Sequence, residues 1–70
     1  MEFREQLMEL RKQRGWSQEQ LGAKIGVTRQ TVSKWETGDT TPELAKLIEL
    51  SSLFEISVDQ LIGIEERKDT

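Results

Sequence analysis

The 70-residue chain contains no cysteine, no histidine and no tyrosine. Without cysteine the chain can form neither disulfides nor thiolate metal sites. Without histidine it lacks the usual zinc ligand and the usual general base. We therefore expect no metal, no cofactor and no catalytic residue, and we predict that the protein is not an enzyme.

Long apolar segments are also missing, because no run approaches the roughly 20 residues that cross a bilayer. The opening "MEFREQ" is acidic where a signal peptide would be basic. These features predict a cytoplasmic protein with no membrane partner. The hydrophobic fraction of 34% and the charged fraction of 33% favour a compact helical domain over a disordered chain. Seventy residues provide for one domain with one small core.

Positive charge is scarce overall but unevenly distributed. The net charge is −3, where a basic domain would be the usual sign of a nucleic-acid-binding protein. Residues 1–34 hold seven basic and four acidic groups, a net charge of +3, whereas residues 35–70 hold three basic and nine acidic groups, a net charge of −6. Screening confines a surface field to about 8–10 Å at physiological salt. The first half can therefore meet DNA while the acidic half faces elsewhere, although two ordinary solvated faces would give the same pattern.

The chain does have apolar residues that recur at the spacing of an α-helix, and this pattern predicts an all-α fold with five short helices. Phe3, Leu7 and Leu10 recur at i, i+4 and i+7 in the first of them. Val32 and Trp35 are the expected inward residues of the third. The five helices are expected within residues 3–15, 17–26, 28–38, 41–54 and 57–63.

Capping residues support these boundaries. Ser17 with Gln20, and Ser57 with Gln60, have the spacing of capping boxes. Trp16 precedes the first of these boxes and is expected to form a hydrophobic staple with Leu21. Thr28 is expected to cap the third helix. Thr41 is expected to cap the fourth helix, with Pro42 in its first position.

The stretch "GVTRQTVSKWETG" stands out because one face of its helix is rich in hydrogen-bond donors. Residues 17–37 form two short helices joined by a tight turn that begins at Gly26. This arrangement is typical of a helix-turn-helix, in which the second helix enters the major groove and the first crosses the DNA backbone. A solvated helix face is the alternative interpretation of the same donors.

Four blocks of sequence extend the match beyond this motif: "LMELRKQRGWSQEQLG", "IGVTRQTVSKWETG", "TPELAKL" and "FEISVDQLIG". In order and spacing they resemble the Cro and lambda-repressor-like family, also called the xenobiotic-response-element family. The resemblance implies a compact five-helix DNA-binding domain over residues 1–63, followed by a polar tail over residues 64–70. It also implies a transcriptional regulator, taken here as a repressor, that binds double-stranded DNA as a homodimer on an inverted-repeat operator.

The resemblance also suggests roles for particular residues. The base-reading positions would be Arg29, Gln30, Ser33 and Lys34. Arginine pairs with guanine and glutamine with adenine, whereas Lys34 could reach guanine or a phosphate. The residues expected to touch the DNA backbone are Gln18, Thr28, Thr31, Thr40 and Arg14. An ion pair between Arg11 and Glu36 is expected to be structural.

Two residues depart from the pattern of that family. Gly22 stands where alanine is usual, which permits close helix packing but costs about 0.8–1.0 kcal/mol in helix propensity. Asp39 stands where a basic residue is common, which weakens the phosphate contact expected from the segment after the third helix.

The fourth and fifth helices carry more apolar residues than one buried face requires. Contiguous apolar patches usually mark an interface, so we predict a homodimer contact that includes Leu53, Ile62 and Ile64. The alternative is that the tail folds back over this surface. The rival function is a protein-binding adaptor or an antitoxin-like module that reuses the fold, with its acidic half as the binding face. No small-molecule ligand is indicated.

Overall fold

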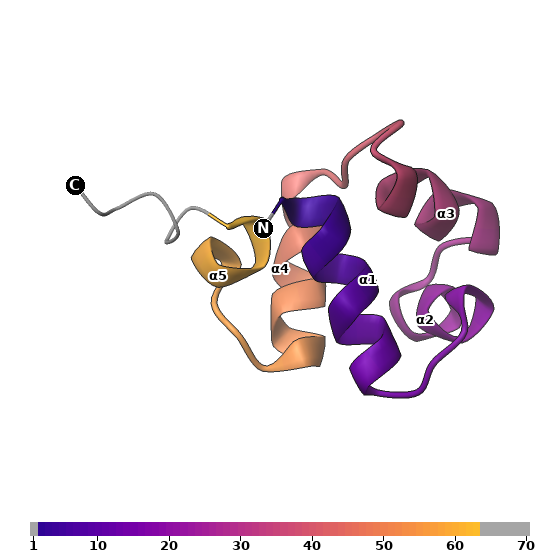
Figure 1. The fold of residues 1–70 in the computed structure, drawn as a ribbon, viewed down its shortest axis with the longest axis horizontal. Coiled ribbons are helices and arrows are strands. Elements are labelled where there is room, and N and C mark those ends of the chain that lie inside the picture. The colour runs from indigo at the N-terminus through magenta and orange to yellow at the C-terminus, as the bar shows by residue number, and fades with distance from the viewer. Residues whose placement is uncertain (1, 64–70) are drawn as a thin grey trace.

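The computed structural model describes residues 2–63 and contains five α-helices within them (Figure 1). They are α1 (Phe3–Gln13), α2 (Gln18–Ile25), α3 (Arg29–Thr37), α4 (Leu44–Phe54) and α5 (Val58–Ile62). No strand occurs in the described residues. The prediction of an all-α, five-helix fold is confirmed, whereas the predicted tail over residues 64–70 lies outside the described part of the chain.

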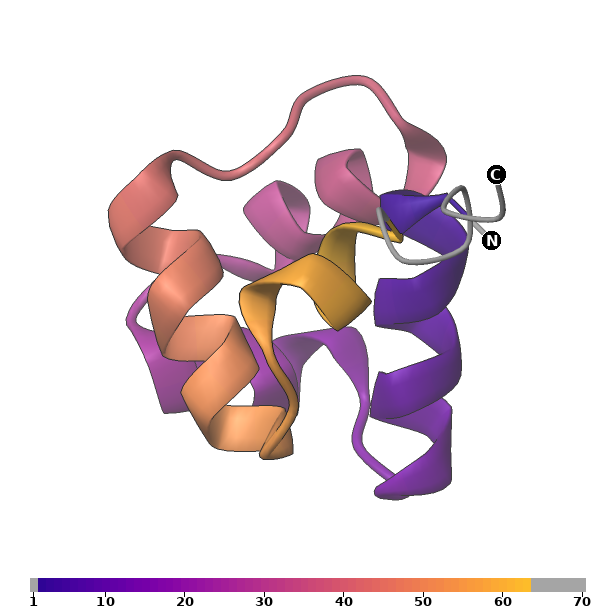
Figure 2. The same cartoon turned by 90° about the vertical axis from the view of Figure 1, so that its left-hand side faces the viewer.

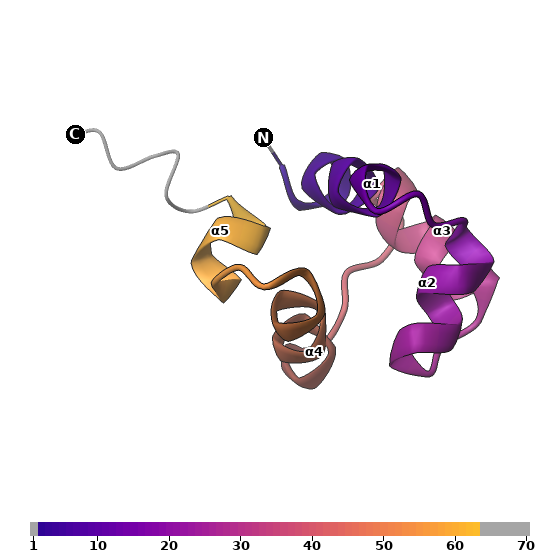
Figure 3. The ribbon, with the colours of Figure 1, turned by 90° about the horizontal axis from the view of Figure 1, so that it is seen from below.

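Helix α1 packs against α3 and α5. Helices α2 and α3 pack against each other at one side of α1, and α5 lies toward the other side (Figures 1 and 3). Figure 2 shows α5 between α1 and α4, and it contacts both. The amide of Gln6 in α1 donates to the carbonyl oxygen of Gln60 in α5 over 3.4 Å. This packing leaves the outer side of α3 open.

A single hydrophobic core joins all five helices. Burying an aliphatic or aromatic side chain contributes about 1.5–3 kcal/mol. Trp16 and Phe3 are partly buried and pack against this core. The ring centroid of Trp16 lies 5.8 Å from that of Phe54. The buried core consists of Leu7, Leu21, Ile25, Val32, Trp35, Leu50, Phe54 and Leu61.

Both predicted capping boxes are formed. The Ser17 hydroxyl accepts from the backbone N–H of Gln20 at 3.0 Å, and the Gln20 side chain accepts from the Ser17 N–H at 2.8 Å. Ser57 and Gln60 make the same pair of bonds at 3.0 and 3.1 Å. Each box satisfies two backbone groups near the start of its helix, which fixes where α2 and α5 begin.

The prediction that Thr41 caps α4, with Pro42 as its first residue, is wrong. The helix begins at Leu44, its N-cap is Glu43, and no side chain caps it. Pro42 is buried in the preceding segment and does not occupy the first helical position. The segment after α3 crosses from the end of that helix to the start of α4 (Figure 1). Extended residues rise about 3.3 Å each and helical ones only 1.5 Å, so an extended path spans this distance with fewer residues.

Candidate nucleic-acid interface

The outer side of α3 carries the four residues expected to read bases. Arg29, Gln30 and Lys34 are exposed and Ser33 is half-buried. Val32, Trp35 and Glu36 point into the protein and are buried. The helical period thus separates a face that holds α3 in the core from a face that presents hydrogen-bond donors to solvent.

The N-terminus of α3 is held by two threonines. The Thr28 hydroxyl accepts from the backbone N–H of Thr31 at 3.1 Å, and the two hydroxyl oxygens lie 3.0 Å apart. Thr28 has an extended backbone, as an N-cap residue requires. These two of the three threonines predicted to touch the DNA backbone therefore lie at the helix N-terminus, where the helix dipole favours an anion.

A tight turn fixes the angle between α2 and α3. Gly26 ends α2 with a φ of 78°, a left-handed conformation that glycine adopts without steric cost. Gly22 is buried, and a Cβ added there would lie 2.6 Å from the Val27 carbonyl oxygen. The glycine that departs from the family pattern thus lies where the turn passes closest to α2.

Lys46 holds this corner from outside, and no local pattern of residues indicated this contact. Its ammonium donates to the Ile25 carbonyl oxygen over 2.9 Å and lies 3.2 Å from the Glu49 carboxylate. A cation at the C-terminal end of α2 interacts favourably with that helix dipole. The contact joins residues 21 positions apart, so only the packing of α4 against α2 reveals it.

Three helices meet at the carboxylate of Glu36. Arg11 donates to it through Nε at 2.7 Å and through Nη2 at 3.0 Å. Gln18, the first residue of α2, donates to Glu36 Oε1 at 3.1 Å. The Arg11 guanidinium also donates to the Trp16 carbonyl oxygen at 2.8 Å. The ion pair expected from the resemblance is therefore present in the structure, and it also orients Gln18.

The charged side chains of this hydrogen-bond network are largely buried. The side chain of Glu36 is 1% exposed and that of Arg11 is 13% exposed. The hydrogen bonds to Glu36 raise the pKa of Arg11 above its ordinary value, against the opposing effect of its partial burial. The pair fixes the start of α2 relative to α3, because Gln18 donates to the same carboxylate.

The two remaining residues expected at the DNA backbone lie in different settings. Thr40 is exposed in the segment that follows α3, and its backbone N–H donates to the Lys34 carbonyl oxygen at 3.3 Å. The guanidinium of Arg14 lies 5.5 Å from the ring centroids of both Trp16 and Phe54. Arg14 therefore has a cation–π arrangement available in the protein, and a phosphate would compete with it.

A family model described as helix-turn-helix matches residues 7–61, most of the chain. Among curated proteins, the HTH-type transcriptional regulator YgzD of Bacillus subtilis (strain 168) is 38% identical over 64 residues, which is 91% of this chain and 97% of YgzD. The HTH-type transcriptional activator BcrR of Enterococcus faecalis is 39% identical over 66 residues, 94% of this chain. The chain spans only 32% of the length of BcrR.

A solved structure gives the same result in three dimensions. The P22 c2 repressor, determined in complex with a synthetic operator, matches with a TM-score of 0.83 and 31% identity. The match covers 89% of this chain and 94% of the repressor chain. The protein belongs to the lambda-repressor-like family of helix-turn-helix transcriptional regulators.

Helix α3 is therefore the second helix of the helix-turn-helix that characterises this family of transcriptional regulators. The relatives that match are named as HTH-type transcriptional regulators. In the described residues, no helix is long and apolar enough to span a membrane. Across the same residues, acidic side chains form no cluster that could hold a metal ion.

The apolar residues of the regulator are distributed differently from the expected interface. Leu53 and Ile62 are half-buried, and Leu53 packs against the core. Ile64 lies outside the described residues. The large apolar side chains that the structure exposes are Leu44, at 67%, and Ile48, at 51%. Both lie on α4, one helical turn apart, and the broad apolar face of that helix was the sequence signal for them.

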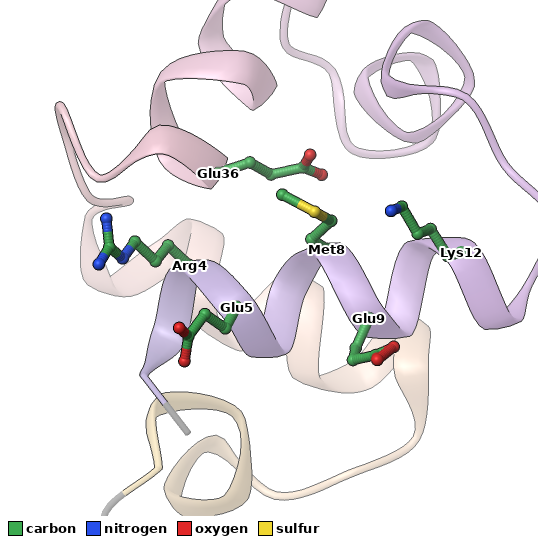
Figure 4. A pocket seen from close by; sticks show the side chains of 6 residues that line it. All are labelled: Arg4, Glu5, Met8, Glu9, Lys12 and Glu36. Atoms are coloured by element: carbon green, nitrogen blue, oxygen red, sulfur yellow. The ribbon is translucent and has the colours of Figure 1, made fainter.

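The regulator also has a shallow cavity of about 500 Å³ between α1 and the end of α3 (Figure 4). Arg4, Met8 and Lys12 point from α1 toward the α3 side, whereas Glu5 and Glu9 point the other way (Figure 4). Glu36 closes the cavity from α3. Small-molecule sites are mostly apolar with a few polar groups, whereas here Met8 is the apolar residue and the others are charged.

Proposed function

We propose that this regulator binds an inverted-repeat operator in double-stranded DNA as a homodimer and represses transcription by occupying it. The observation that carries the proposal is the donor face of α3, formed by Arg29, Gln30 and Lys34 with Ser33 beside them. It stands next to the N-terminus of α2 in a fold similar to that of a repressor solved on operator DNA. Repression by occupancy requires nothing of the protein beyond DNA binding.

The proposed contacts fall into two groups. Arg29 and Gln30 lie in the first turn of α3, the end that touches base edges in this motif. Arginine would pair with guanine O6 and N7, and glutamine with adenine N6 and N7. Contacts with the DNA backbone are proposed for Gln18, Thr28, Thr31 and Thr40. Arg14 would make a further contact when its guanidinium moves from the aromatic rings to a phosphate.

Selection of bound sequences from a pool of random duplexes tests base reading. We expect the wild-type protein to enrich an inverted repeat with half-site centres about 34 Å apart, one helical turn of DNA. Arg29→Ala and Gln30→Ala should each flatten one position per half-site, because a lost bidentate contact costs about 1–3 kcal/mol at that base pair. If both variants keep the full wild-type preference, this face does not read bases.

Dimerisation needs a separate test, because two apolar surfaces compete for it. Ile62→Asp probes the interface expected from the sequence, and Ile48→Asp probes the exposed face of α4. Sedimentation at micromolar concentration should show a dimer for the wild-type protein and a folded monomer for one of the two variants. A wild-type protein that stays monomeric both free and on DNA contradicts the dimer.

The exposed pair Leu44 and Ile48 also supports the second candidate, a protein-binding adaptor, because exposed apolar patches mark interaction sites. The same selection separates the two functions. Enrichment of one inverted repeat supports the regulator acting on its operator. The adaptor is supported by the lack of any enriched sequence together with a protein that co-purifies with the wild type and is lost with Ile48→Asp.

A further inference from the structure

A positively charged side chain from α1 contacts the C-terminal end of α3. Arg4, in the first turn of α1, donates through Nη1 to the carbonyl oxygen of Thr37, the last residue of α3, over 3.5 Å. Its aliphatic stem lies over Gly38, where an added Cβ would be 3.2 Å from Arg4 Cδ. Figure 4 shows Arg4 extending from α1 toward this end of α3. The guanidinium is therefore positioned by the last residue of α3 and the glycine that follows it.

The segment after α3 does not itself carry a positive charge. Residues 38–43 read "GDTTPE", with two carboxylates and no lysine or arginine. Asp39 is exposed, and its backbone N–H donates to the Lys34 carbonyl oxygen at 2.9 Å. Arg4 thus places a cation at a corner of the molecule where the adjacent sequence is acidic.

Arg4 is also free to take another partner. Its side chain is 47% exposed, and its Nε lies 3.3 Å from the carboxylate of Glu2, which is itself exposed. Exposed ion pairs of this kind contribute little to stability and are easily exchanged. The guanidinium has five N–H donors in a planar fork, so the bonds to Thr37 and Glu2 leave donors for a phosphate.

The dimensions of the groove place this corner near the DNA backbone. A helix of nine residues, as α3 is, spans about 13.5 Å. The major groove is about 12 Å wide, so a helix whose first turn touches bases brings its last turn toward the phosphates that line the groove. We propose that Arg4 makes a DNA-backbone contact from the C-terminal end of α3. This inference rests on the proposed operator binding.

The test measures how salt weakens binding of the full chain to the operator that the wild-type protein selects. Each lost phosphate contact should reduce the slope of log K against log salt by about 0.9 per subunit. We expect this reduction for Arg4→Gln and not for Arg4→Lys, which keeps the charge. Lys24→Gln is the matched control, because it also removes one positive charge, at a position where the ammonium lies 4.6 Å from the Trp16 ring centroid.

Selection and melting temperature complete the design. Arg4→Gln should select the same base sequence as the wild type, because a backbone contact is independent of base identity. A variant that lowers the melting temperature but keeps the wild-type salt slope shows that Arg4 only caps α3, and overturns the inference. So does an equal loss of slope for Lys24→Gln. A wild-type protein that selects no operator overturns the proposed function as well.

Discussion

Replacing Glu36 with glutamine should destabilise the protein strongly without changing which bases it prefers. The carboxylate accepts three hydrogen bonds, two from Arg11 and one from Gln18. Glutamine keeps the shape but offers one oxygen in place of two, and its amide N–H groups would face the donors of Arg11 or Gln18. The guanidinium of Arg11 would then remain largely buried without a countercharge.

The structure sets the size of the effect. Removing one partner of a buried ion pair costs about 3–5 kcal/mol. Arg11 retains 13% exposure, so water can solvate it in part and we expect a loss near the lower end, about 3 kcal/mol. A domain of this length has about 4–10 kcal/mol of stability in total. The variant should therefore still fold, with a melting temperature lower by about 12–24 °C.

Urea unfolding followed by tryptophan fluorescence gives the free energy, because Trp35 is buried in the core and becomes exposed on unfolding. Glu9→Gln is the matched control, since it removes an exposed carboxylate from α1 and should change stability by less than about 0.5 kcal/mol. Arg11→Met combined with Glu36→Gln should cost less than the sum of the two single changes, because residues in one network are coupled.

The pH dependence has a defined sign. The pKa of Arg11 is raised in the folded state, so its stabilising contribution is complete below the unfolded-state pKa and is lost only as pH rises through the folded-state value. Between about pH 6 and pH 9 the titration of Arg11 should therefore leave the cost of Glu36→Gln unchanged. The reasoning is refuted by a variant that melts like the wild type but selects a different operator.

Three further changes test the packing that positions α2, α3 and α4. Gly22→Val should lower the free energy of unfolding by about 1–3 kcal/mol, because its Cβ would meet the Val27 carbonyl oxygen at 2.6 Å. The urea midpoint should fall accordingly, and an unchanged midpoint would show that the turn moves freely. Lys46→Met should lower the free energy of unfolding by about 1 kcal/mol, because the hydrogen bond to the Ile25 carbonyl oxygen is lost. The melting temperature should fall by about 4–8 °C. A wild-type melting temperature would mean that the bond is not formed in solution. Glu55→Gly should raise the melting temperature. Glu55 ends α4 with a left-handed φ of 61°, and glycine removes a steric cost of about 1 kcal/mol. A lower melting temperature would contradict this prediction.

The sequence predicted most of the elements because their signals are local. Ser17 with Gln20, and Ser57 with Gln60, lie three residues apart, and each pair can cap a helix regardless of what surrounds it. The inward face of α3 followed from helical spacing at Val32 and Trp35. The donor face of α3 could be predicted from the same helical spacing, because the side of a surface helix opposite its buried face is exposed to solvent.

What failed or was missed depended on residues far apart in the chain. The start of α4 was misplaced because Thr41 and Pro42 are good cap residues locally, but the distance from α3 to α4 and the burial of Pro42 decided the outcome. Lys46 and Arg4 found their partners 21 and 33 positions away, at carbonyl oxygens that end α2 and α3.

The exposed apolar residues show the same division. The sequence indicated more apolar surface than one face requires, but it could not decide which residues stay outside. The packing of α4 against α2 and α5 buries Leu50 and Phe54 and leaves Leu44 and Ile48 in solvent. Local hydrogen bonds and helical periodicity therefore determined which segments are helices and which face of α3 is polar. Tertiary packing alone decided which backbone ends, charges and apolar groups meet, because those contacts depend on helix positions that no short stretch of sequence specifies.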